Sequence, residues 1–256
     1  KDSEGRVRAA AVQALAAVAE RGDQAALDAV SCFLKDDDGC VRESALKTLV
    51  AVADKGCKAA INTAGRCLED TDRGVKMAAV QTMVMLAGKG DADAMALVCE
   101  RLEHKDARVR DVAVQAFTLL AVKGDAVAMS IVGGRLEHAD AHVREAAVRA
   151  FTAVVAKGNS LAIAAVTKSI LDADAGVRRC ALRAIAAVAE KEDAATIVEV
   201  SGSLEHPDAR IREAAKRSLA AVAETGDVAA IFAMSGRQEA RKKSAGVSSL
   251  PYHGTM

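Results

Sequence analysis

Three histidines in matching surroundings are the first residues of this chain that could do chemistry. His104, His138 and His206 each follow a Leu-Glu pair, so Glu103 and Glu137 stand beside the first two. Neutral imidazole is a common metal ligand, and carboxylates can complete such a set. A metal site is therefore one interpretation, and solvated loop histidines are the other. We favour the second, and the sequence predicts no metal and no cofactor.

Six cysteines could supply thiolates, but no two of them form a Cys-x-x-Cys pair. Disulfide and zinc frameworks need fixed spacings, so we expect thiols without a structural role. Free thiols favour a reducing compartment, either the cytoplasm or an organelle interior. No glycine-rich phosphate loop or Ser-His-Asp spacing is present, so we predict no catalytic residues and a protein that is not an enzyme. The cysteines are Cys32, Cys40, Cys57, Cys67, Cys99 and Cys180.

A column of basic residues is the third candidate. Each member follows a valine or isoleucine, and successive members are 34 residues apart. Such a column on a helical array could bind an acidic partner. Its members are Arg8, Arg42, Lys76, Arg110, Arg144, Arg178 and Arg212.

The elements that carry this column are predicted helices. Aspartate stands three residues before most of the paired valines, as Asp106 does before Val109, and is suited to cap a helix N-terminus. Glycine recurs with the same 34-residue step, as at Gly90 and Gly124, and we expect it to end helices in the left-handed conformation. Apolar residues between these signals recur with helical spacing. Each repeat is therefore a helical hairpin, with a short first helix and a longer second one.

A fixed period of this length predicts a repeat architecture. We expect an all-α solenoid of stacked helical hairpins over residues 1–242, with six full repeats between two half-repeats, and an irregular tail over residues 243–256. Glu192 replaces the expected glycine, which predicts a weaker joint there. The first half-repeat lacks a polar outer face, so we expect a fragment of a longer array or an end that a partner covers.

The repeated string Asp-x-x-Val-Arg-x-x-Ala resembles the HEAT repeat, and the phycobilisome-lyase-type subgroup is the most similar. Residues 204–215 show it best, and the resemblance covers residues 1–240. Tetratricopeptide repeats share the period but use Trp and Tyr in the first helix. Here Trp is absent and the only tyrosine, Tyr252, lies in the tail.

The resemblance implies a structural role for the basic column. In HEAT-like repeats such a residue bonds an acidic loop residue between neighbours, and Asp36 stands six residues before Arg42. We favour this structural inter-repeat ladder over a binding function. Before Arg110, Arg144 and Arg212 the acidic position is histidine, so their pairing must differ.

The resemblance also implies an enzymatic alternative. A bilin lyase, or a lyase-type chaperone subunit handling a tetrapyrrole, would need a pigment pocket. The sequence contains no cluster of Tyr, Trp or Cys suited to hold one. A non-enzymatic protein–protein interaction scaffold, or a structural subunit of a larger assembly, is the preferred prediction.

The exposed face of the second helices is the best predicted binding surface. One of its columns begins Gln13, Lys47 and becomes basic toward the C-terminus. Since arginine suits carboxylate recognition, we expect an acidic protein segment to bind within residues 140–243, although a mixed, solvated face is the alternative. The candidate binding residues are Arg149, Arg183, Arg217, Arg108, His142, Arg179, Arg210 and Phe232.

The overall charge favours no other partner class. Lysine plus arginine and aspartate plus glutamate both number 35. Nothing global therefore suggests nucleic acid or an anionic membrane. No uninterrupted apolar run long enough for a transmembrane helix is present. We expect protein partners within a multi-subunit assembly.

Overall fold

The computed structural model describes residues 2–189 and 194–222. The chain divides into two compact units, Lys1–Val155 and Ala156–Met256. Several predictions concern residues outside the described ranges: Phe232 as a binding residue, the break at Glu192, the half-repeat over 227–242 and the tail over 243–256.

The first unit consists of helices alone in its described part, residues 2–155, and the short first helix and longer second helix of each predicted hairpin are present. Short 3-10 helices follow two of the first helices, at Cys67–Glu69 (η1) and Arg101–Glu103 (η2). The α-helices are α1 (Asp2–Val18), α2 (Gln24–Phe33), α3 (Gly39–Val52), α4 (Lys58–Arg66), α5 (Arg73–Ala87), α6 (Ala92–Glu100), α7 (Ala107–Leu120), α8 (Ala126–Gly133) and α9 (Ala141–Val154).

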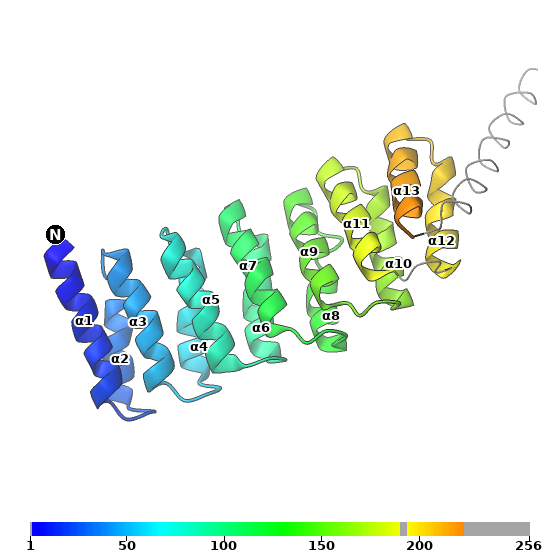
Figure 1. Cartoon of the computed structure of the whole chain (residues 1–256). Coiled ribbons are helices and arrows are strands. Elements are labelled where there is room, and N and C mark those ends of the chain that lie inside the picture. The colour runs from blue at the N-terminus through cyan, green and yellow to red at the C-terminus, as the bar shows by residue number, and fades with distance from the viewer. Residues whose placement is uncertain (1, 190–193, 223–256) are drawn as a thin grey trace, which may run out of the picture. The chain divides into compact units, whose positions relative to one another are not determined.

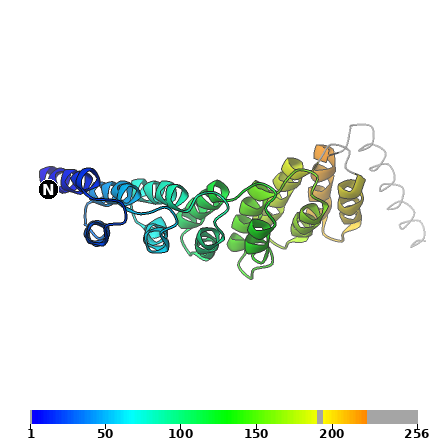
Figure 2. The ribbon, with the colours of Figure 1, turned by 90° about the horizontal axis from the view of Figure 1, so that it is seen from below.

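These helices form two rows (Figures 1 and 2). The second helices α1, α3, α5, α7 and α9 pack side by side in one row, and the first helices α2, α4, α6 and α8 form the other. The core between the rows consists of small and aliphatic residues with few aromatics, including the fully buried Leu49, Met83, Leu102 and Phe117. The fold is an α-solenoid of helical hairpins, as predicted.

The second unit repeats the hairpin pattern over residues 156–189 and 194–222. Its α-helices are α10 (Ser160–Lys168), α11 (Ala175–Val188), α12 (Ala194–Ser201) and α13 (Ala209–Val222), with 3-10 helices η3 (Ser169–Leu171) and η4 (Gly202–Glu205). Helices α10 and α12 pack together, and α11 packs against α13. Across both units, no described helix has the length and apolarity that crossing a membrane would require.

The predicted aspartate caps are confirmed. Each of six second helices begins after an aspartate whose carboxylate accepts a backbone N–H, as Asp106 Oδ1 does from Arg108 N at 2.8 Å. The other five caps are Asp38, Asp72, Asp140, Asp174 and Asp208. Most first helices have a cap of the same kind, which the sequence analysis did not identify: Asp23, Asp91, Asp125 and Asn159.

The glycine column has the predicted backbone conformation but a different role. Gly124 has φ +83°, yet α7 ends at Leu120 and Ala121 caps it with extended backbone. The glycine therefore lies in the loop after the helix and does not end it. Its N–H donates at 2.7 Å to the carbonyl oxygen of Val154, which is the last residue of the next second helix.

The same backbone bond recurs at five glycines of the column in the described part of the chain. Helix ends leave carbonyl groups without partners inside the helix. The loop glycine of the preceding hairpin satisfies one of them, and its positive φ directs the N–H toward the neighbour. The pairs are Gly22–Val52, Gly56–Leu86, Gly90–Leu120, Gly124–Val154 and Gly158–Val188, with N···O distances of 2.7–2.9 Å.

Candidate functional site: an arginine-lined groove

From Arg42 onward, each member of the basic column donates to a carbonyl of the loop that precedes its own helix. Arg42 Nη1 donates to Asp36 O at 2.6 Å and to Asp37 O at 3.1 Å. Lys76 makes only the first type of bond, from Nζ to Asp70 O at 2.8 Å. The column therefore fastens each loop to its helix. The corresponding Nη1 bonds to the carbonyl six residues earlier are made by Arg110, Arg144, Arg178 and Arg212.

In the first unit, Arg8 and Arg42 also bridge neighbouring hairpins, as the resemblance implied. Arg8 Nε and Nη2 donate to the two carboxylate oxygens of Asp36 at 2.7 and 2.8 Å. Arg42 holds Asp70 with the same two atoms at the same distances. Hydrogen bonding from the Arg8 guanidinium lowers the pKa of Asp36 below its ordinary value. Both carboxylates are thus kept charged and fixed.

Histidine changes this pattern in the way its chemistry requires. His206 Nδ1 accepts a hydrogen bond from the backbone N–H of Asp208 at 3.1 Å. In other loops an aspartate oxygen accepts the equivalent bond, as Asp70 Oδ1 does from Asp72 N. His104 and His138 do the same for Asp106 and Asp140. A histidine that accepts at Nδ1 carries its proton on Nε2. It preserves the loop but offers no carboxylate to the basic residue of the preceding hairpin. The expected difference in pairing for Arg110, Arg144 and Arg212 stays a prediction.

The sequence analysis missed a second set of ion pairs between hairpins. Arg101 Nε lies 3.2 Å from Glu69 Oε1, and Arg135 Nε lies 3.0 Å from Glu103 Oε1. Each joins a loop-entry segment to that of the preceding hairpin. The positions equivalent to Arg101 are Cys67 in one neighbour and Ser169 two hairpins on, so no basic column is visible there.

The candidate binding residues separate into two groups. Arg149 is already paired, with Nη1 2.6 Å from Asp111 Oδ1. Arg108 and His142 are exposed at the starts of α7 and α9 in the first unit. The remaining described candidates belong to the second unit and are exposed: Arg179, Arg183, Arg210 and Arg217.

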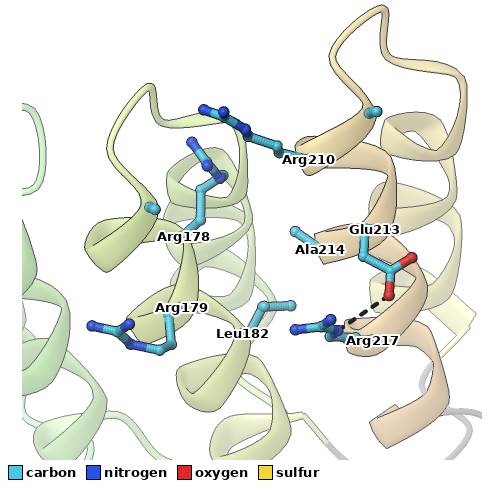
Figure 3. Close-up of a pocket in the computed structure, with 9 residues that line it drawn as sticks. Arg178, Arg179, Leu182, Arg210, Glu213, Ala214 and Arg217 are labelled. Atoms are coloured by element: carbon cyan, nitrogen blue, oxygen red, sulfur yellow. Dashed lines mark hydrogen bonds and ion pairs between the residues drawn. The ribbon is translucent and has the colours of Figure 1, made fainter.

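Three of those four line one groove, of about 510 Å³, between α11 and α13. Figure 3 shows Arg178 and Arg210 at the same end of the groove, and Arg217 extending across it toward Leu182. The one carboxylate among the lining residues, Glu213, lies 3.2 Å from Arg217 Nε. Four guanidinium groups against one carboxylate make the groove strongly basic. Its lining is Ala175, Arg178, Arg179, Leu182, Ala209, Arg210, Glu213, Ala214 and Arg217.

The corresponding face of the first unit has a different character. At the repeat positions equivalent to Arg179, the first unit has Glu43, Met77, Asp111 and Glu145. Glu43 and Lys47 pair with each other on α3. Of the two units, the described part of the second therefore has the arginine-lined groove.

The histidines and cysteines show how the other candidate chemistry is placed. Over the described ranges, no three His, Cys, Asp or Glu side chains are grouped to hold a metal ion. Burial raises the pKa of the Cys99 and Cys67 thiols to about 11. Such thiols are poor nucleophiles at neutral pH. Cys32 and Cys40 are exposed.

Comparison with known proteins agrees with this architecture. Residues 1–83 match the family model for HEAT repeats. The matched residues include the bridging Arg8 and Arg42. No curated protein sequence matches the chain. The phycobilisome-lyase-type subgroup stays a prediction.

Solved helical-repeat structures are similar to the chain over most of its length. The archaeal HEAT-like repeats protein from Thermococcus onnurineus NA1 is 15% identical, with 87% of this chain and 97% of that chain covered and a TM-score of 0.45. A designed armadillo repeat protein in complex with the peptide (KR)4 is 19% identical, with 77% and 99% covered and a TM-score of 0.42.

Proposed function

We propose that this chain is a non-enzymatic interaction scaffold that binds an acidic segment of a protein partner on the second helices of its second unit. The groove between α11 and α13 supports this proposal, because Arg178, Arg179, Arg210 and Arg217 line it against a single glutamate. Helical-repeat solenoids present extended surfaces and bind protein partners through them. We further propose that the scaffold is a subunit of a larger assembly.

Arginine is the side chain suited to this task. Its planar guanidinium offers donors in a fork that matches a carboxylate with two parallel hydrogen bonds. Arg179 and Arg183 lie one helical turn apart on α11, and Arg217 lies across the groove on α13, so an extended acidic segment could contact several of them. Affinity would then be spread over two hairpins.

Arg149 is a weaker candidate for partner binding than the arginines of the second unit. Arg149 would have to leave Asp111 before it could bind a partner, and that exchange would cost most of what it gained. The proposal therefore assigns the binding energy to Arg179, Arg183, Arg210 and Arg217.

A charge-reversal variant tests the proposal. The triple variant Arg179→Glu, Arg183→Glu, Arg217→Glu should lose binding to a fluorescein-labelled peptide of alternating aspartate and glycine, measured by fluorescence anisotropy. A control with the same change in net charge reverses three exposed loop lysines of the first unit: Lys55, Lys89 and Lys123. Equal binding by the two triple variants would contradict the proposal.

The natural partner is found by a second measurement. Purification of the tagged chain from its source cells, followed by mass spectrometry, should recover a protein that contains an acidic segment. That protein should be absent when the Arg179, Arg183 and Arg217 triple variant is used and present with the lysine control. Elution of the wild-type chain from a sizing column as a free monomer in cell extract would argue against the larger assembly.

A further inference from the structure

Arg178 differs from Arg8 and Arg42 in one respect that points to a ligand. All three hold backbone oxygens or carboxylates at the joint between loop and helix, and Arg8 and Arg42 each bind an aspartate of the next hairpin through Nε and Nη2. For Arg178 the structure shows only the two Nη1 bonds, to Asp172 O at 2.7 Å and Ala173 O at 2.8 Å. Within the described ranges, no carboxylate pairs with its Nε and Nη2 atoms.

The cause lies in the next hairpin. The residue that corresponds to Asp36 for Arg8 and to Asp70 for Arg42 is His206 for Arg178. His206 uses Nδ1 for the N–H of Asp208, and its other ring nitrogen carries a proton, so it supplies no oxygen to the arginine. The Nε/Nη2 edge of Arg178 therefore keeps the geometry for a carboxylate but has lost the one that the chain provides elsewhere.

Arg178 also lines a space that a ligand can enter. Arg178 is 6% exposed and lines the groove between α11 and α13. Arg210 stands at the same end of the groove (Figure 3) and adds a second guanidinium. A buried arginine without a carboxylate is costly, and a bidentate hydrogen-bonded anion offsets that cost.

Arg110 shows why this argument favours the second unit. Its corresponding neighbour is also a histidine, His138. However, Asp111 follows Arg110 directly, whereas Arg179 follows Arg178. Asp111 is paired with Arg149 and adds no positive charge beside Arg110, whereas Arg179 adds one beside Arg178, so the two arginines differ in the charge that surrounds them.

We propose that the Nε/Nη2 edge of Arg178 binds the carboxylate of an aspartate in the partner's acidic segment, in the place that Asp36 and Asp70 take on Arg8 and Arg42. This inference rests on the proposed function and names the anchoring contact within it. Aspartate fits because the chain itself fills the equivalent edges with aspartate, at 2.7 and 2.8 Å. The partner residue completes the series of inter-hairpin ion pairs from outside.

The test supplies the missing carboxylate from within the chain. In the His206→Asp variant, the new aspartate should occupy the Arg178 edge, and binding of the aspartate-glycine peptide should weaken at least tenfold. The same variant should unfold at a higher urea concentration than the wild type, because the chain gains an ion pair of the Arg42–Asp70 kind. His206→Asn should bind the peptide as the wild type does, since its side-chain oxygen can accept the Asp208 N–H without adding charge.

Two further variants make the result specific. His104→Asp adds the same charge in the first unit, opposite Lys76, and should leave peptide affinity unchanged. Arg178→Lys keeps the charge but removes the fork, and should weaken binding about tenfold. A circular dichroism spectrum like that of the wild type shows that this variant is folded.

Two outcomes would overturn the inference. Wild-type affinity in His206→Asp, with binding lost in the Arg179, Arg183 and Arg217 triple variant, would leave the proposed function standing and remove Arg178 from it. An equal loss in His206→Asn would assign the effect to the histidine itself. Undiminished binding by the triple variant would instead contradict the proposed function.

Discussion

Gly56 and Gly134 make a matched pair for measuring what the loop glycines contribute to stability. Gly56 has φ +76°, and a Cβ built on it would meet no atom within 4 Å. Gly134 has φ −59° and ψ −18°, an ordinary helical conformation, and its Cβ would also meet nothing within 4 Å. The same substitution to alanine at both positions therefore differs in backbone conformation and not in steric contact.

The expected effects have opposite signs. Alanine in the left-handed region costs about 1–2 kcal/mol, so Gly56→Ala should lower the free energy of unfolding by that amount. If the loop relaxes to a negative φ, the bond from Gly56 N to Leu86 O at 2.8 Å is lost, at a cost of about 1 kcal/mol. Gly134→Ala should raise the free energy of unfolding by about 0.4–1 kcal/mol, because alanine restricts the unfolded chain.

Urea unfolding followed by circular dichroism measures both changes under the same conditions. Both glycines belong to the first unit, so the two variants report on the same cooperative structure. A difference of about 2 kcal/mol between them is the expected result. If both variants shifted the midpoint equally and in the same direction, the argument from positive φ would be refuted.

Three further predictions follow from the packing. Asp70→Asn should cost about 2 kcal/mol in urea unfolding, because its ion pair is only 12–13% exposed. Asp93→Asn, from a pair 72–80% exposed, should leave the midpoint nearly unchanged, and equal shifts would contradict the role of burial. Thr82→Val should cost about 1 kcal/mol in the same assay, since its buried hydroxyl donates to a carbonyl of the preceding second helix at 3.1 Å, and an unchanged midpoint would show that this bond contributes nothing. In single-cysteine variants titrated with a disulfide reagent at pH 8, Cys32 should react quickly and Cys99 slowly, because burial raises the pKa of the Cys99 thiol to about 11. Equal rates in the two variants would count against that burial.

Local signals in the sequence predicted local structure well. An aspartate such as Asp106 acts within three residues of itself, so its spacing from Val109 is enough to place a helix start. The 34-residue period then predicted where each hairpin lies in the chain. Gly124 was harder, because its conformation is local but its hydrogen-bond partner, Val154, lies in the next hairpin. The sequence predicted the left-handed conformation of this glycine correctly but predicted the wrong role for it, the ending of a helix.

The candidate site shows the same limit. Arg149 and Arg217 occupy equivalent positions in the repeat and were predicted as one surface. Their partners differ: Arg149 reaches Asp111 on the preceding second helix, and Arg217 pairs with Glu213 on its own helix. Which carboxylate an exposed arginine takes depends on side-chain geometry across neighbouring helices, and a column of residue types carries no such information.

The glycine bonds between hairpins give the array a direction. In each bond the donor belongs to a loop and the acceptor to the following helix end, as from Gly22 N to Val52 O. One side of a hairpin therefore offers an amide and the other a carbonyl. Two identical sides cannot satisfy each other through this bond, so it cannot join two copies about a two-fold axis. An addition through it must be head-to-tail, and such contacts extend into filaments unless the rotation closes a ring.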